Sequence, residues 1–180
     1  MFTKNRIHVL LGILGLLFGS LVYLIDRPPE HTYFISTHNI HLSLYYTFPK
    51  LFGLLGHRLP SFIHVFSFAL ITAGLFAHKR KEYLGACFLW FLIDCAFELG
   101  QRFDTWSARM IPDWFWGIPY LENTKNYFSK GTFDFGDVAA IALGAVVAYL
   151  VLIIPKQRRD ITWWRKNIHL LRFCNISFSH

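Results

Sequence analysis

The sequence predicts an all-α, polytopic membrane protein with four transmembrane helices in a single membrane domain over residues 1–180. The chain is 54% hydrophobic and 18% aromatic, which is more apolar than a typical soluble domain. It contains four apolar stretches of roughly the 17–25 residues that an α-helix needs to cross a bilayer. No internal repeat or linker divides them, so they are expected to form one unit.

The predicted spans cover about residues 7–25, 60–77, 83–100 and 136–154. Lys4 and Arg6 precede the first span, as basic residues precede the core of a secretory signal. The apolar run is too long for such a core, however, and no small-residue cleavage site follows it. We therefore interpret this segment as a retained membrane anchor.

Small residues recur on one face of the first and the last span. They are Gly15 and Gly19 in the first, and Gly136, Ala140, Gly144 and Ala148 in the last. Small residues at four-residue spacing allow the backbones of two membrane helices to approach closely. The pattern predicts helix packing and favours no particular activity.

The loops that join the spans on the outer side, residues 26–59 and 101–135, are rich in aromatic residues. Trp and Tyr are enriched at the membrane–water boundary, so short interfacial helices are expected in both loops. Two further uses stay open, a lid over a pocket and a surface for a partner protein. After the last span, residues 160–173 have the pattern of a basic amphipathic helix on the cytoplasmic membrane surface.

The distribution of basic residues predicts that both termini are cytoplasmic in a bacterial plasma membrane. In this orientation, eleven of the 18 Lys and Arg residues lie on the inner side, as the positive-inside rule requires. The formal net charge of +7 then reflects topology, so anionic lipid is a better expected partner than nucleic acid. The cysteines show no metal-binding spacing, and no cofactor is expected.

Asp94 and Glu98 lie inside the third predicted span and are the most informative residues of the chain. A carboxylate within the bilayer costs roughly 2.5 kcal/mol or more, so such a residue faces the protein interior and is often functional. Gln101 follows at helical spacing and extends the same face. His64 in the second span, Asp137 at the start of the fourth and Arg102 in the adjoining loop are expected at a similar depth.

This candidate polar cluster has three possible uses. In the structural use, Asp94 or Glu98 pairs with Arg102, Lys130 or His64, and Asp137 caps the fourth helix. In the second, the acids accept hydrogen bonds from hydroxyls or amines of a lipid or cell-envelope precursor headgroup, and arginine binds the phosphate of that headgroup. In the third, a carboxyl group beside His64 moves a proton or acts in catalysis. We favour a protein that is not an enzyme, since the sequence contains no hydrolase, metalloprotease or phosphate-loop motif.

Three segments resemble the VanZ-like family of integral membrane proteins. They are LPSFIHVFSFALITAGL, which contains His64, the Glu98-Leu-Gly-Gln101 motif, and GTFDFGDVAAIALGAVVAYL, which contains Asp137 and Gly144. The resemblance covers about residues 60–152, and Ile141 stands where the family usually has asparagine. It implies a multi-pass helical fold, in which His64, Glu98, Gln101 and Asp137 match the family's motif residues.

Together, these observations predict a VanZ-like, non-catalytic envelope protein that binds a lipid or envelope-precursor headgroup. The main alternative is an accessory subunit packed against a larger membrane complex, and an intramembrane enzyme comes third.

Overall fold

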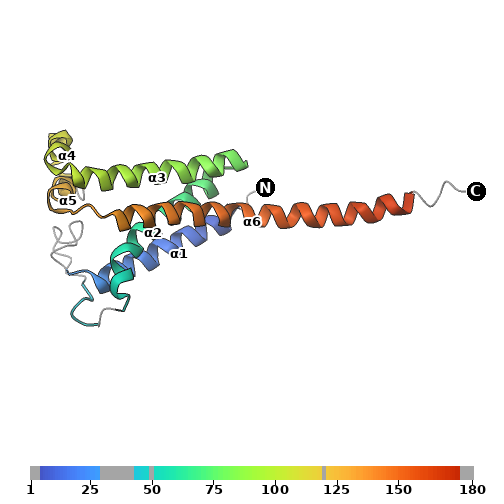
Figure 1. The fold of residues 1–180 in the computed structure, drawn as a ribbon, viewed down its shortest axis with the longest axis horizontal. Coiled ribbons are helices and arrows are strands. Elements are labelled where there is room, and N and C mark those ends of the chain that lie inside the picture. The colour runs from blue at the N-terminus through green and yellow to red at the C-terminus, as the bar shows by residue number, and fades with distance from the viewer. Residues whose placement is uncertain (1–4, 29–42, 49–50, 119–120, 175–180) are drawn as a thin grey trace, which may run out of the picture.

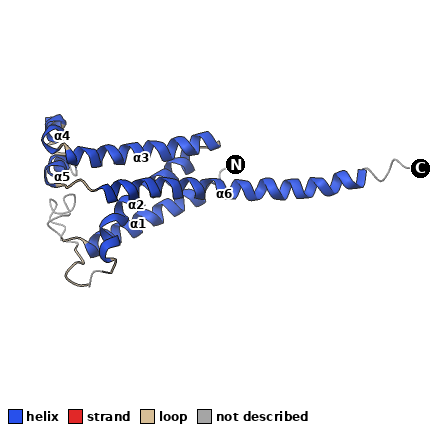
Figure 2. Cartoon of the chain, in the orientation of Figure 1, coloured by secondary structure: helices blue, strands red, loops and turns tan. Residues whose placement is uncertain are grey.

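All elements are helical in the part of the chain that the structure describes, which comprises residues 5–28, 43–48, 51–118 and 121–174 (Figure 2). The structure is a computed structural model, and for residues 155–174 it describes the backbone alone. No strand occurs among these residues. The predicted all-α fold class is therefore confirmed.

Four long helices form the bundle: α1 (Asn5–Asp26), α2 (Gly53–Phe76), α3 (Arg80–Arg102) and α6 (Phe135–Cys174). Each contains a stretch long and apolar enough to cross a membrane, namely Arg6–Asp26, Leu55–Phe76, Arg80–Arg102 and Phe135–Ile154. About 20 residues at 1.5 Å each span the roughly 30 Å of the hydrocarbon core. The prediction of four membrane-spanning helices is confirmed by length and composition.

The second helix begins earlier than predicted, at Gly53 instead of Pro60. Proline removes only one N–H donor, and the turns before it are held from outside the helix. The carboxylate of Asp26 accepts hydrogen bonds from the N–H groups of Leu51 and Phe52, each at 3.1 Å. This contact ties the end of α1 to the start of α2 and places seven further residues on the helix.

Helix α2 lies at the centre of the bundle and packs against α1, α3 and α6, while α3 also packs against α6. The start of α1 and the exit of α6 lie at one end of the bundle, and the short helices lie at the other (Figure 1). The core contains small and aliphatic side chains, among which Leu70, Ala73, Ala148 and Leu152 are almost fully buried.

Glycines allow the closest helix contacts. A Cβ atom on Gly15 would collide with the Ser67 hydroxyl, and one on Gly19 would lie 2.8 Å from Ile63. A Cβ on Gly144 would lie 2.5 Å from the carbonyl oxygen of Phe62. Gly15 and Gly19 thus set the approach of α1 to α2, and Gly144 sets that of α6 to α2. Along the same face of α6, Ala148 is buried, Ala140 is half-buried and Gly136 lies against the side chain of Arg58.

The loop between α3 and α6 forms a layer of short helices at one end of the bundle, which we call the α4–α5 end (Figure 1). These are α4 (Asp104–Met110), η3 (Asp113–Phe115), η4 (Leu121–Asn123) and α5 (Thr124–Lys130). Short helices were expected here. In the other loop, residues 43–48 form turns, and residues 29–42 and 49–50 lie outside the described part.

Helix α6 continues without a break from Phe135 to Cys174 and projects well beyond the bundle (Figure 1). Residues 160–173 are helical, and they extend the axis of the fourth span instead of forming a separate helix. Pro155 lies inside α6 and has no N–H to donate, so one backbone hydrogen bond is missing there. The residues that follow include several good helix formers, and the helix continues past it. Forty residues give a helix of about 60 Å, twice the hydrocarbon thickness.

Candidate functional site

Polar side chains from five segments gather toward the α4–α5 end, and we call this group the polar cluster. Its members are Arg27 after α1, Arg58, Ser61 and His64 of α2, Asp94, Glu98 and Gln101 of α3, Tyr127 of α5, and Asp134 and Asp137 at the start of α6. Five of the six predicted binding residues belong to it.

His64 and Asp94 form a close pair between α2 and α3, with 2.7 Å between His64 Nδ1 and Asp94 Oδ2. The Asp94 carboxylate is buried, whereas 47% of the His64 side chain is exposed. The imidazole also lies edge-on to Phe68 and Trp90, and the Trp90 indole donates to the Thr72 hydroxyl at 2.9 Å. The ring is thus fixed in orientation by a carboxylate and two aromatic neighbours.

Glu98 links α3 to the beginning of α6. Its side chain is buried, and Oε1 accepts a hydrogen bond from the N–H of Asp134 at 2.9 Å. Asp134 in turn accepts from the N–H of Gly136 at 2.8 Å and lies 3.5 Å from the guanidinium of Arg58. Asp134 therefore caps α6, and the expectation that Asp137 does so is wrong, because Asp137 is already the third residue of the helix.

Asp137 is instead directed into the bundle, where its carboxylate accepts a hydrogen bond from the Ser61 hydroxyl. The hydrogen bonding of this carboxylate is incomplete, because its Oδ1 atom is buried and has no hydrogen-bond partner. Buried polar atoms are nearly always paired with protein or ordered water, so this carboxylate oxygen has an unmet hydrogen-bonding demand.

Arg27 has a similar unsatisfied atom. One terminal nitrogen donates to the carbonyl of His57 at 3.1 Å, and the guanidinium lies 5.0 Å from the centre of the Tyr23 ring. Its Nε is buried without a hydrogen-bond partner. Arg27 interacts electrostatically with both Glu98 and Asp137, yet among the described residues it forms no ion pair within 4.0 Å.

Tyr127 and Gln101 close one side of the cluster. The two side chains are hydrogen-bonded, and Gly131 lies directly against Gln101. Burial, followed by the nearby charge of Glu98, raises the pKa of Tyr127 to about 12, and the bond with Gln101 opposes this rise. The phenol is therefore neutral and remains a hydrogen-bond donor at physiological pH.

Arg102 is the predicted member that lies elsewhere. Its exposed guanidinium is 5.5 Å from the centre of the Phe133 ring, and it forms no ion pair with any described acid. Arg27 and Arg58 supply the cations of the cluster instead. Arg58 lies one turn before Ser61 on α2. It was missed from the sequence because the predicted span began only at residue 60, which left Arg58 in a loop.

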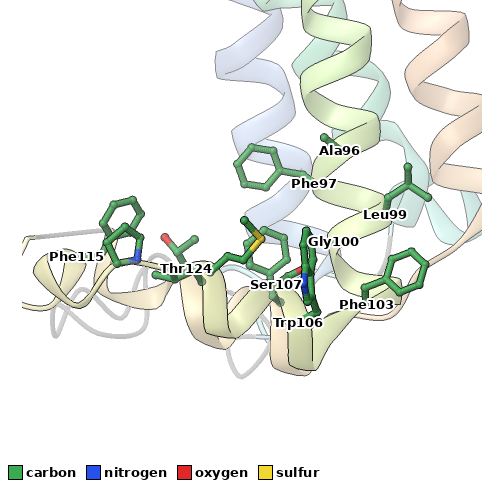
Figure 3. A pocket seen from close by; sticks show the side chains of 13 residues that line it. Ala96, Phe97, Leu99, Gly100, Phe103, Trp106, Ser107, Phe115 and Thr124 are labelled. Carbon is green, nitrogen blue, oxygen red and sulfur yellow. The ribbon is translucent and has the colours of Figure 1, made fainter.

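An apolar groove of about 480 Å³ lies at the same end of the bundle, at the end of α3 (Figure 3). Residues from α3, α4 and α5 line it, including Phe97, Phe103, Trp106, Met110 and Phe128. The groove-lining residues of α3 and the polar residues at 94, 98 and 101 occupy opposite faces of that helix. The groove is therefore separate from the polar cluster.

The fold and the site define the chain as a polytopic α-helical membrane protein with a mixed-charge cluster toward one end of its bundle. Comparison with known protein families, curated proteins and solved structures finds no match. Within the described part of the chain, no group of three or more His, Cys, Asp or Glu side chains is arranged to hold a metal ion.

Proposed function

We propose that this chain is a VanZ-like protein of the bacterial plasma membrane that binds the polar headgroup of a lipid or lipid-linked envelope precursor in the polar cluster. The observation that carries this proposal is the set formed by Arg27, Glu98 and Asp137. These charges influence one another, but Arg27 pairs directly with neither acid.

Charged groups inside a bundle are costly unless they are paired and hydrogen-bonded. A ligand with complementary charges offsets this cost when it enters, so the arrangement favours binding. Arg27, Arg58 and Asp137 lie near the ends of the spanning helices, which in a bilayer corresponds to the level where lipid headgroups meet water. A membrane lipid reaches this depth by lateral diffusion.

The proposed orientation places both termini in the cytoplasm and the cluster on the extracytoplasmic side. It is supported by the basic residues near the N-terminus and by Lys79, Arg80 and Lys81 at the start of α3, which lie at the opposite end from α4 and α5. The bound headgroup is then that of an outer-leaflet lipid or of a precursor exported to that leaflet. We propose binding without a chemical step.

The test is native mass spectrometry of the full chain purified in mild detergent. Wild-type protein is expected to retain a lipid at defined stoichiometry, and Arg27→Gln is expected to lose it while eluting as a monodisperse, helical protein. Glu82→Gln is the matched control, because it removes an exposed charge at the opposite end. A folded wild-type protein without specific lipid, or equal retention by both variants, contradicts the proposal.

The alternative function, an accessory subunit of a membrane complex, is favoured by a different observation. The apolar groove adjoins a surface where Trp106, Trp114 and Trp116 are each at least 64% exposed. Aromatic side chains are enriched at protein interfaces. This function predicts a stoichiometric partner protein that copurifies with the wild type and with Arg27→Gln but not with Trp106→Ala. Purification of the wild-type chain from its native membrane without a partner argues against this function.

A further inference from the structure

Arg27 and Asp137 present two opposite hydrogen-bonding demands to a ligand. Arg27 Nε is a buried donor without an acceptor, and Asp137 Oδ1 is a buried acceptor without a donor. The two side chains interact electrostatically but do not form an ion pair. A group that satisfies both atoms must therefore accept a hydrogen bond on one side and donate one on the other.

The surrounding charges divide in the same way. Arg58 interacts electrostatically with Asp137, as Arg27 does, so two guanidinium groups face an anion bound there, provided that Arg58 gives up its 3.5 Å pair with Asp134. Glu98 also interacts with Asp137, so two carboxylates are available to a cation. Guanidinium groups suit phosphate because their donors match its oxygens, and a primary ammonium offers three N–H donors to carboxylates.

We infer that the polar cluster recognises a zwitterionic group that combines a phosphate with a primary amine, with the phosphate at Arg27 and Arg58 and the amine at Asp137 and Glu98. This inference rests on the proposed headgroup-binding function and names its ligand class. A purely anionic headgroup meets repulsion from the two carboxylates. A quaternary ammonium has no N–H to donate to Asp137 Oδ1.

The experiment uses the full chain in nanodiscs that contain equal amounts of phosphatidylethanolamine, phosphatidylglycerol and phosphatidylcholine, followed by native mass spectrometry of retained lipid. We expect phosphatidylethanolamine to be enriched about tenfold or more, as the loss of a charged hydrogen bond implies. Asp137→Asn is expected to reduce this enrichment and to increase retention of phosphatidylglycerol. Arg27→Gln is expected to weaken retention of both.

Each variant is compared with Glu82→Gln, and its thermal unfolding is measured first. If Asp137→Asn does not fold, Ser61→Ala removes the hydroxyl that holds Asp137 and is expected to weaken selectivity for the amine in the same direction. Added soluble phosphoethanolamine separates the two sources of this chemistry. Displacement of bound lipid supports recognition of the headgroup alone, and continued retention of phosphatidylethanolamine supports a lipid bound also through its chains.

Preferential retention of phosphatidylglycerol or phosphatidylcholine, unaffected by Asp137→Asn, overturns the zwitterionic inference and leaves headgroup binding intact. Retention of no lipid above its nanodisc fraction by folded wild-type protein overturns both. An unchanged preference for phosphatidylethanolamine in both Asp137→Asn and Arg27→Gln means that the lipid binds elsewhere, for example in the apolar groove, and also overturns the inference.

Discussion

His64 Nδ1 lies 2.7 Å from Asp94 Oδ2, and this contact joins two membrane-spanning helices, α2 and α3. The carboxylate is buried while the imidazole is about half exposed, so the histidine shields an acid that would otherwise face an apolar surrounding. Removing one partner of a buried pair leaves the other charge without compensation, which costs more than the pair itself contributes. This asymmetry gives the first prediction.

His64→Ala is expected to lower the free energy of unfolding by about 1–3 kcal/mol, less than for a fully buried pair because the imidazole is partly exposed. In the background of Asp94→Asn, the same change is expected to cost clearly less, because no buried charge is left behind. Thermal or denaturant unfolding in detergent of wild type, both single variants and the double variant measures this coupling. Additive effects would show that the contact contributes nothing specific.

Gly144→Ala is expected to destabilise the bundle by about 1–3 kcal/mol, because overpacking forces α6 away from α2. The added Cβ would lie 2.5 Å from the Phe62 carbonyl oxygen, which cannot move independently of α2. Gly85→Ala is the matched control, since nothing lies within 4 Å of its Cβ position in α3. That control is expected to be neutral or to stabilise by up to about 1 kcal/mol through helix propensity. Two changes of the same sign and size would contradict close packing at Gly144.

Asp26→Ala is expected to loosen the attachment of the start of α2 to the end of α1. The carboxylate accepts from the N–H groups of Leu51 and Phe52, and its removal leaves these two donors unsatisfied at a cost of about 1–3 kcal/mol each if they stay buried. Hydrogen exchange by mass spectrometry should show faster exchange in the peptide that contains residues 51–52. Gly56→Ala should act in the same direction, because its Cβ would collide with the Asp26 carboxylate. Unchanged exchange in both variants would exclude this anchoring role.

Tyr127 is expected to ionise near pH 12 in the folded protein, against about 10 for an ordinary tyrosine. The unfolded chain loses this proton first, so the stability associated with the neutral phenol is complete below pH 10 and is lost as the pH rises toward 12. The difference in absorbance at the tyrosinate band between wild type and Tyr127→Phe reports this pKa. Glu98→Gln should lower it, because the Glu98 charge contributes to the shift. A rise in the pKa would contradict the proximity of the two side chains.

Arg27 and Arg102 are expected to differ in their importance for ligand binding. Arg27→Gln should reduce lipid retention about tenfold or more, as expected for a lost charged hydrogen bond. Arg102→Gln should leave retention nearly unchanged, because Arg102 lies over Phe133 outside the polar cluster. Native mass spectrometry of both variants in one lipid mixture makes this comparison. The reverse order would restore the sequence-based choice of Arg102 as a binding residue.

Local patterns account for the parts of the fold that were predicted correctly. An apolar stretch of about 20 residues must form a helix in a bilayer, because the backbone has no other hydrogen-bond partners there. Helical periodicity likewise places Asp94, Glu98 and Gln101 on one face of α3, and the structure turns that face toward α2, α5 and α6.

The polar cluster was only partly predictable, because its missing members come from segments far apart in the chain. Arg27 and Glu98 are 71 positions apart, and nothing in the local pattern around Arg27 distinguishes it from an ordinary loop cation. Asp134 was passed over in favour of Asp137 because capping depends on the residue at which α6 begins. A shift of three positions moves a carboxylate from the helix cap to the bundle interior.

The sequence alone therefore determined the number of spans, their approximate limits and the presence of acids within them, since these follow from hydropathy and helical spacing. The tertiary structure decided which groups meet: His64 with Asp94, Glu98 with Asp134, and Arg27 near both Glu98 and Asp137 without a direct pair. It also decided that α6 continues past the bundle. The physical reason is that hydropathy acts on each segment separately, whereas pairing of charges depends on the distances and rotations at which the helices pack.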